Sequence, residues 1–304
     1  MIEVDELTKR YGGTTAVKDL SFTVRPGRVT GFLGPNGAGK STTLRLLIGL
    51  DRPTAGTATI DGLPFRDRPR GLRHVGALLD ASDVHGGRTA RAHLSALARS
   101  NALPKRRVDE VLHEVGLTGA ARRRIGGFSL GMRQRLGIAA ALLGDPPVLL
   151  FDEPINGLDP EGVLWVRGLF RRLAAEGRTV FVSSHLMSEM ESTADELVVI
   201  GRGELIAAES VTDFAARGTR SSVTVRTPDA AALTALLTAE GAEVTTAADD
   251  APLAVTGLDA ARVGELAHRH HIRINELTTS SASLEEAFME LTADSVEYGA
   301  GDPR

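Results

Sequence analysis

The stretch that decides the fold is GPNGAGKST, residues 34–42. It has the spacing G-x-x-x-x-G-K-[ST], which Lys40 and Ser41 complete. An apolar run typical of a strand, VTGFL (29–33), comes directly before it, and a helical pattern, TTLRLLIGL (42–50), follows. Glycines let backbone N–H groups turn toward phosphate oxygens, and the positive end of the following helix faces the same charge. The stretch therefore predicts an α/β domain with a site for a nucleoside triphosphate.

The residues of this loop have separate predicted tasks. Lys40 can reach the β- and γ-phosphates of the nucleotide, and the Ser41 hydroxyl can ligate Mg²⁺. The alternative is a glycine-rich turn with a chance Lys-Ser pair, and the strand before it and the helix after it argue against that interpretation. The predicted nucleotide-binding residues of the loop are Gly34, Pro35, Asn36, Gly37, Ala38, Gly39, Lys40, Ser41 and Thr42.

A second signal of a nucleotide site is PVLLFDEP, residues 147–154. A buried strand would deliver Asp152 at its carboxyl end, where the carboxylate can hold Mg²⁺ directly or through water. Glu153 can then lie beyond the γ-phosphate and polarise an attacking water. A strand that ends in an acidic turn is common by itself, but in the same chain as the phosphate loop the pair indicates a site for Mg²⁺ and a nucleoside triphosphate.

Composition and charge narrow the class of protein. The chain has 304 residues, 42% of them hydrophobic, with a formal net charge of −4 and no cysteine. This charge does not indicate a nucleic-acid partner, and the lack of cysteine excludes disulfides and thiolate metal sites. The N-terminus is too charged for a signal peptide, and no stretch reaches the roughly 18 uncharged apolar residues of a membrane-spanning helix. We expect any transport across a membrane to require another chain.

The order of the remaining patterns predicts two domains and a tail. Strand-like runs flank a helical pattern at residues 161–177, which implies a parallel sheet covered on both faces. Beyond residue 218 the order is strand, helix, strand, strand, helix, strand, which suggests a small ferredoxin-like unit with a terminal helix after it. We expect a nucleotide-binding domain at 1–218, a small α+β domain at 219–292 and a disordered tail at 293–304.

Five motifs together resemble one family. The phosphate loop, FSLGMRQRL (128–136), LLFDEP (149–154), NGLDP (156–160) and VSSH (182–185) occur in the order and spacing of ATP-binding-cassette (ABC) ATPases. The resemblance covers about residues 1–210. It implies an α/β fold with a mixed core sheet, an antiparallel β subdomain and a helical subdomain, and it implies ATP and Mg²⁺ as ligands.

The segment FSLGM, residues 128–132, resembles the family signature and is called the signature segment below. The resemblance implies that Ser129 and the Gly131 backbone contact the γ-phosphate of ATP held by a second subunit, at a helix that begins near Met132. A hydroxyl, an unhindered N–H and a helix N-terminus all suit an anion. Leu130 and Met132 depart from the family pattern, so we expect a weaker grip on ATP. A simple helix N-cap on Ser129 is compatible with this role.

The resemblance assigns four further residues. Asp159 is similar to a carboxylate that crosses the dimer interface, and His185 to a histidine that contacts the γ-phosphate, which makes Lys40, Glu153 and His185 the predicted catalytic set. Tyr11 is at the position where the family stacks an aromatic ring on adenine. Asp80 stands where the family has a Mg²⁺-sensing glutamine. It is either a changed Mg²⁺ ligand or merely a loop carboxylate.

The resemblance implies the ATP-hydrolysing subunit of an ABC transporter. The stretch 183–210 and the ending SLEEAFMELT (283–292) resemble exporters of the drug- and antibiotic-resistance type. The partners implied are a second copy or a paralogous cassette and a separate membrane permease, on the cytoplasmic face of the membrane. The alternative is an ABC ATPase that acts on ribosomes or nucleic acid; such proteins usually carry two cassettes, coiled-coil arms or zinc cysteines.

Overall fold

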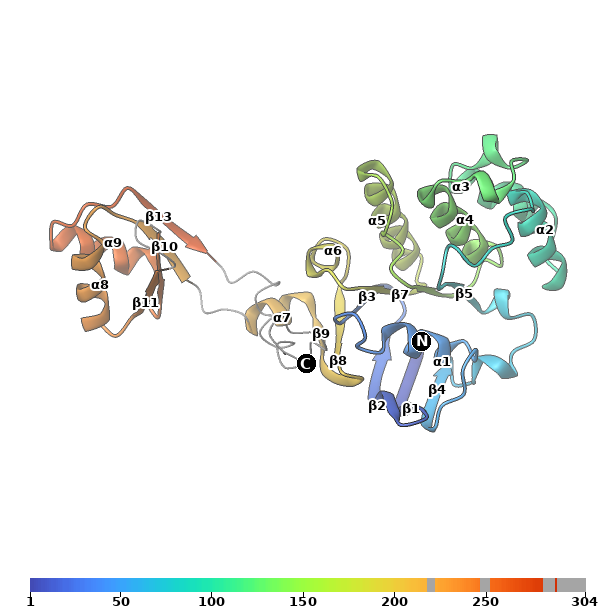
Figure 1. The fold of residues 1–304 in the computed structure, drawn as a ribbon, viewed down its shortest axis with the longest axis horizontal. Coiled ribbons are helices and arrows are strands. Elements are labelled where there is room, and N and C mark those ends of the chain that lie inside the picture. The colour runs from blue at the N-terminus through green and yellow to red at the C-terminus, as the bar shows by residue number, and fades with distance from the viewer. Residues whose placement is uncertain (218–221, 247–251, 281–287, 289–304) are drawn as a thin grey trace. The chain divides into compact units, whose positions relative to one another are not determined.

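The chain forms two compact units, the N-terminal unit Met1–Val211 and the C-terminal unit Thr212–Leu291 (Figure 1). The computed structural model describes residues 1–217, 222–246, 252–280 and 288. The boundary between the units falls at the start of α7 (Val211–Arg217), whereas the sequence suggested residue 218. The predicted terminal helix, apart from Phe288, and the predicted disordered tail lie outside the described residues.

A six-stranded sheet forms the centre of the N-terminal unit. Its order is β5-β6-β7-β3-β8-β9; the first five strands are parallel, and β9 is antiparallel to β8. Apolar side chains on both faces of β6 and β7 are buried, as expected for strands covered by helices on both sides. The strands are β3 (Arg28–Leu33), β5 (Val75–Leu78), β6 (Val148–Phe151), β7 (Thr179–Ser184), β8 (Glu196–Gly201) and β9 (Glu204–Ser210).

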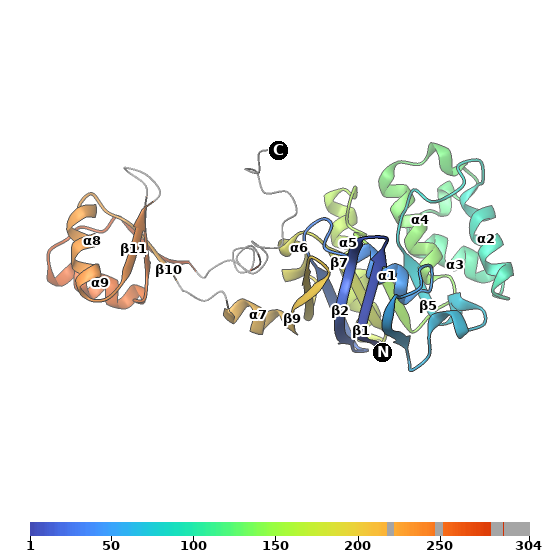
Figure 2. The same cartoon turned by 60° about the horizontal axis from the view of Figure 1, so that its bottom comes forward.

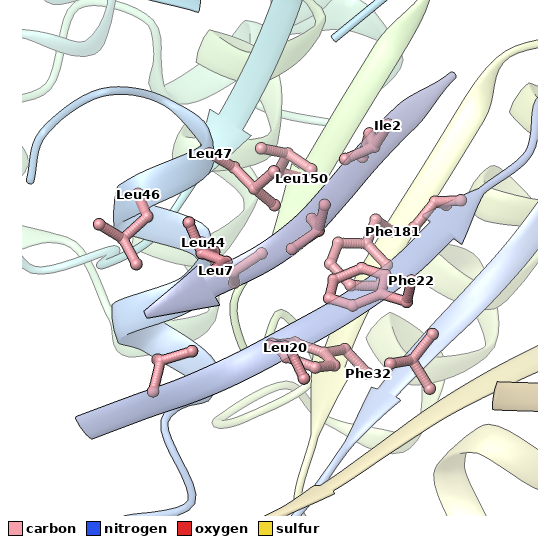
Figure 3. Packing of buried hydrophobic residues seen from close by; sticks show 14 of the residues in the cluster. Ile2, Leu7, Leu20, Phe22, Phe32, Leu44, Leu46, Leu47, Leu150 and Phe181 are labelled. Carbon is pink, nitrogen blue, oxygen red and sulfur yellow. The ribbon is translucent and has the colours of Figure 1, made fainter. Parts of the chain in front are cut away.

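A three-stranded antiparallel sheet, in the order β2-β1-β4, packs on this central sheet. It comprises β1 (Ile2–Tyr11), β2 (Thr14–Val24) and β4 (Ala55–Ile60). Figure 3 shows Leu20 and Phe22 of β2 against Phe32 and Phe181 of the central sheet, with leucines of α1 (Lys40–Leu47) beside them. The ring centroids of Phe32 and Phe181 are 5.0 Å apart. Apolar residues alternate with polar ones along β2, whereas the charged residues of β1 hide the pattern of its apolar residues, which face this core.

Helices cover the central sheet and form a separate group beside β5 in Figures 1 and 2. This group contains α2 (Ala90–Ser100), α3 (Arg106–Glu114) and α4 (Leu130–Leu142), and α5 (Pro160–Ala175) packs on β3 and β7. The helix expected to begin near Met132 begins at Leu130, because the Ser129 hydroxyl accepts the Met132 N–H and caps it. The short helix α6 (Met187–Glu191) follows β7.

The C-terminal unit has its own sheet and core. Four antiparallel strands in the order β11-β12-β10-β13 carry two helices, in the chain order strand, helix, strand, strand, helix, strand. This is the split β-α-β arrangement of ferredoxin-like domains, as the sequence suggested. The elements are β10 (Ser222–Arg226), α8 (Ala230–Ala239), β11 (Glu243–Thr246), β12 (Leu253–Thr256), α9 (Ala260–Arg269) and β13 (Glu276–Ser280). Over the described ranges, none of the helices combines the length and apolar character that crossing a bilayer requires.

Candidate nucleotide site

The predicted site residues leave the central sheet at one edge. The phosphate loop follows β3, Asp152 and Glu153 follow β6, and His185 follows β7. These strands are neighbours in the order β6-β7-β3 and run parallel, so their carboxyl ends share that edge. Ligands in open α/β sheets bind at such an edge. Residues far apart in the sequence thus converge because the sheet order brings them together.

The phosphate loop turns tightly from β3 into α1. Gly39 has φ +100°, in the region that favours glycine, and a Cβ there would lie 2.5 Å from the backbone oxygen of Ala16. The loop therefore requires glycine at this position for both conformation and space. A pocket opens over the loop, and its lining residues are Ala16, Asn36, Gly37, Ala38, Gly39, Lys40, Ser41, Thr42 and Glu153.

Lys40 lies at the first position of α1 and is almost fully buried, with 6% of its surface exposed. Its ammonium donates hydrogen bonds to the backbone oxygens of Gly34 (2.7 Å) and Pro35 (3.2 Å). Burial lowers the pKa of Lys40, and the nearby carboxylates of Glu153 and Asp152 act in the opposite direction. A buried cation at the start of a helix is suited to a phosphate.

Glu153 connects the three strand ends. One carboxylate oxygen, Oε1, lies 3.7 Å from Lys40 Nζ, and the other, Oε2, lies 3.1 Å from His185 Nδ1 and accepts a 2.5 Å hydrogen bond from Asn156 Nδ2. Its backbone has φ 46°, a left-handed conformation that costs a non-glycine residue about 1 to 3 kcal/mol. The predicted catalytic set, Lys40, Glu153 and His185, is therefore in mutual contact through this one side chain.

Asp152 and Ser41 supply the oxygen atoms that Mg²⁺ prefers. The Ser183 hydroxyl donates to Asp152 Oδ1 at 2.5 Å and accepts the Glu153 N–H at 2.9 Å, so it orients both acidic residues. Ser41 is exposed on the pocket wall. A hydroxyl and a partly exposed carboxylate at the phosphate loop are hard donors, and they fit the predicted ion.

Asp80 lies two residues beyond the end of β5 and is exposed. Its Oδ1 accepts the backbone N–H of Ser82 at 2.6 Å, which closes a turn in its own loop. This hydrogen bond favours the second alternative, a loop carboxylate. Gln134 is the one glutamine in the whole chain, so no other loop can supply the glutamine of the family pattern.

Tyr11 ends β1 beside the phosphate loop and is 46% exposed. Its hydroxyl donates to Asp51 Oδ2 at 2.9 Å, and the Lys9 ammonium lies 4.7 Å from the ring centroid. Desolvation and the Asp51 hydrogen bond raise the pKa of Tyr11, whereas Arg45 and Thr42 lower it. An exposed ring anchored by its hydroxyl can offer a face to a base.

The signature segment lies at the N-terminus of α4. Ser129 and Leu130 are exposed, and Gly131 and Met132 are partly exposed. Leu130 lies over Gly157, where φ is +76° and a Cβ would be 2.2 Å from Leu130 Cδ2. Of the described residues that line the pocket over the phosphate loop, none belongs to this segment.

Asp159 caps α5. Its Oδ1 accepts the Gly162 N–H at 2.9 Å, and Pro160 occupies the first position of the helix, where a missing N–H costs nothing. Asp159 is exposed and belongs to the loop of residues 152–159, which joins β6 to α5.

Comparisons with known proteins decide the family. The ABC transporter family matches residues 17–156, and a domain of unknown function, DUF8746, matches residues 221–285. YhcH of Bacillus subtilis (strain 168), an uncharacterised ABC transporter ATP-binding protein, is 37% identical over 98% of this chain and 97% of its own length. The chain belongs to the ABC transporter family.

Other ABC proteins agree with this membership. The bacitracin transport ATP-binding protein BcrA of Bacillus licheniformis is 43% identical over 68% of each chain. A dimeric cassette of a bacterial ABC transporter has a TM-score of 0.65 and 26% identity, covering 69% of this chain and 99% of that one. A dimeric post-hydrolysis cassette bound to ADP and Pi has a TM-score of 0.64 and 25% identity, with the same coverage. The expected fold and family are confirmed, and this ABC chain is an ATP-binding, ATP-hydrolysing transporter subunit.

Three residues of this ABC chain that contact Glu153 were missed in the sequence. Ser183, Asn156 and Gln134 each hydrogen-bond Glu153 or its backbone. Ser183 and Asn156 stand inside the motifs VSSH and NGLDP, so proximity to a motif is a usable signal for them. Gln134 is four residues along α4 from Leu130, and its contact with the 152–159 loop is known only from the fold.

Proposed function

We propose that this subunit powers export of a small antibiotic-like molecule through a separate membrane permease, from the cytoplasmic face of the membrane. The names of its relatives support this assignment: two BcrA proteins are bacitracin transport ATP-binding proteins, and SrtF of Streptococcus pyogenes is a lantibiotic transport ATP-binding protein at 34% identity. The same names count against action on ribosomes or nucleic acid.

Two copies close head to tail on two ATP molecules in this proposal. The observation that carries it is the separation of the two half-sites: the pocket over the phosphate loop includes Lys40 and Glu153 but no described residue of the signature segment. Ser129 and Gly131 at the exposed start of α4 are then free to contact the γ-phosphate held by another copy. Asp159 belongs to the loop that Leu130 contacts at Gly157, and in this proposal it crosses the dimer interface.

In hydrolysis, Lys40 holds the β- and γ-phosphates and Glu153 accepts a proton from the attacking water. His185 contacts the γ-phosphate and, through the 3.1 Å contact with Oε2, keeps the Glu153 carboxylate in place. Tyr11 stacks on adenine. Ser41 and Asp152 would hold Mg²⁺, which neutralises phosphate charge when bound. Asp80 remains outside this set, because its own loop engages its carboxylate.

The variant Glu153→Gln tests both the residue role and the dimer. An amide has nearly the same shape but cannot take the proton, and removal of a general base costs about 10²- to 10⁴-fold in rate. We expect phosphate release to fall at least about 100-fold and an ATP-bound dimer to accumulate at saturating Mg·ATP, as measured by light scattering.

The matched control is Glu110→Gln, which makes the same change on α3, where Glu110 pairs with Arg107. It should hydrolyse ATP at the parent rate. A Glu153→Gln protein that stayed monomeric and hydrolysed normally would refute both parts of the proposal. Purification from membranes adds a test of transport, since a multi-spanning protein should be recovered in fixed stoichiometry.

A further inference from the structure

Gln134 is a buried polar residue on α4, two residues beyond the signature segment. It is 6% exposed, and its amide nitrogen donates to two backbone oxygens of the 152–159 loop, those of Glu153 (3.3 Å) and Asn156 (3.2 Å). Among the described residues, no partner meets its buried Oε1. The opposite amide orientation would set an oxygen against two carbonyl oxygens, so the two donors define the side chain's position.

The backbone of Glu153 needs such support. Its left-handed φ of 46° is unfavourable for a residue with a side chain, and strained backbone persists where surrounding contacts hold it. Both of its peptide groups are held by polar side chains: Ser183 accepts the N–H at 2.9 Å, and Gln134 donates to the C=O. These two contacts come from β7 and α4, two elements that are distant from the loop in the sequence.

The direction of the Glu153 side chain follows from this backbone. In the observed conformation its carboxylate lies within 3.7 Å of Lys40 and 3.1 Å of His185. We infer that Gln134 is a positioning residue for ATP hydrolysis, because it holds Glu153 in the left-handed conformation that aims the carboxylate at the nucleotide. The inference rests on the proposed role of Glu153 as the proton acceptor.

Gln134 lies between the parts of the chain that, in the proposed dimer, act on two different ATP molecules. Its helix is capped by Ser129, which in the proposed dimer contacts the partner's ATP, while Glu153 acts on the ATP of its own chain. Leu130 makes a second contact between the same two elements, over Gly157. Gln134 and Leu130 therefore connect the proposed contact with the partner's ATP to Glu153 within one chain.

The variant Gln134→Met tests this role, since methionine keeps the length of the side chain and removes both donors. We expect the kcat of ATP hydrolysis to fall about 10-fold or more while the Kd for ATP, titrated without turnover, stays within twofold. Combined with Glu153→Gln, the change should lower the residual rate no further, because the two residues act through one group. A second variant, Gln134→Glu, should lose kcat equally.

Arg135→Met is the matched control on the same helix. Its Nη1 donates to the backbone oxygen of Val115 at 3.2 Å, away from the 152–159 loop. This control should lower the melting temperature as much as Gln134→Met does and leave kcat within twofold. If Gln134→Met and Arg135→Met each lost kcat in proportion to the fall in melting temperature, Gln134 would be a structural residue and the inference would be overturned.

Two other results would also overturn it: a Gln134→Met protein with parental kcat, or losses that multiply in the double variant. The proposed function fails separately. If Glu153→Gln alone leaves hydrolysis unchanged, the role of Glu153 is wrong and the positioning role falls with it. If Glu153→Gln abolishes hydrolysis and both Gln134 variants are as active as the parent, only the inference about Gln134 is lost.

Discussion

At the scale of single residues, the hydroxyl of Tyr11 takes part in a hydrogen-bond network of charged side chains. Its hydroxyl donates to Asp51, and Asp51 also accepts a 2.7 Å hydrogen bond from Arg45 Nε on α1. The Arg45 and Tyr11 hydrogen bonds lower the pKa of Asp51, so the carboxylate stays ionised as an acceptor. The ring is thus fixed relative to the helix that begins in the phosphate loop.

Two substitutions of Tyr11 distinguish the contribution of the ring to ATP affinity from that of the hydroxyl. Stacking of a base on an aromatic ring is worth about 1 to 3 kcal/mol, so Tyr11→Ala should raise the Kd for ATP roughly 5- to 150-fold. Tyr11→Phe keeps the ring but loses the hydrogen bond to Asp51, and it should raise the Kd for ATP less than about 10-fold. Titration of a fluorescent ATP analogue into the Glu153→Gln background measures both. Equal losses in the two variants would mean that the hydroxyl, not the ring, binds the nucleotide.

At the scale of elements, the start of α4 and the 152–159 loop fit together as a pair. Leu130 is 51% exposed on one side and covers Gly157 on the other. From the sequence, this leucine was known only as a departure from the family signature. In the fold it fills the space that a side chain at residue 157 would need, so the two positions constrain each other.

A double-mutant cycle tests this fit. Gly157→Ala adds a Cβ at positive φ and displaces Leu130, whereas Leu130→Ala removes the atoms in the way. We expect Gly157→Ala to lower the free energy of unfolding in both backgrounds, but by a smaller amount when Leu130 is already alanine. The difference between the two losses should be at least about 0.5 kcal/mol, as is usual for residues in contact. Urea unfolding supplies the free energies. Additivity within about 0.3 kcal/mol would show that the contact has no energetic consequence.

At the scale of the whole molecule, two separate hydrophobic cores support the two units. One contains Leu20 with the residues around the central sheet, and the other contains Leu237 between α8, α9 and their sheet; the clusters share no residue. Two cores of this kind predict two unfolding transitions instead of one. The C-terminal unit can then lose stability without loss of the nucleotide site.

Matched leucine truncations check this independence. Both Leu20 and Leu237 are fully buried, and Leu→Ala at such positions costs about 2 to 5 kcal/mol. Leu237→Ala should lower the midpoint temperature of one calorimetric transition and leave ATP hydrolysis by the purified protein unchanged. Leu20→Ala should lower the other transition. A single cooperative transition that both variants shift equally would contradict the prediction.

Much of the site was predictable because its parts are contiguous in the chain. Residues 34–42 carry their own geometry, since glycine spacing and the following helix are local properties. The strand endings before Asp152 and His185 were visible as short apolar runs, because strands buried on both faces are apolar throughout. The strand at residues 2–11 was missed, since its charged outer face hides the alternation of its buried residues.

The sequence by itself determined the phosphate loop, the acidic strand end, the cap on Ser129 and the order of elements in the C-terminal unit. Each depends on neighbours within a few residues. Only the tertiary structure decided that Glu153 contacts Lys40 and His185, that Leu130 covers Gly157, and that the single glutamine holds the Glu153 carbonyl. Those contacts join α1, the 152–159 loop, the residue after β7 and α4. The packing that brings these parts together is long-range, and local sequence patterns do not specify it.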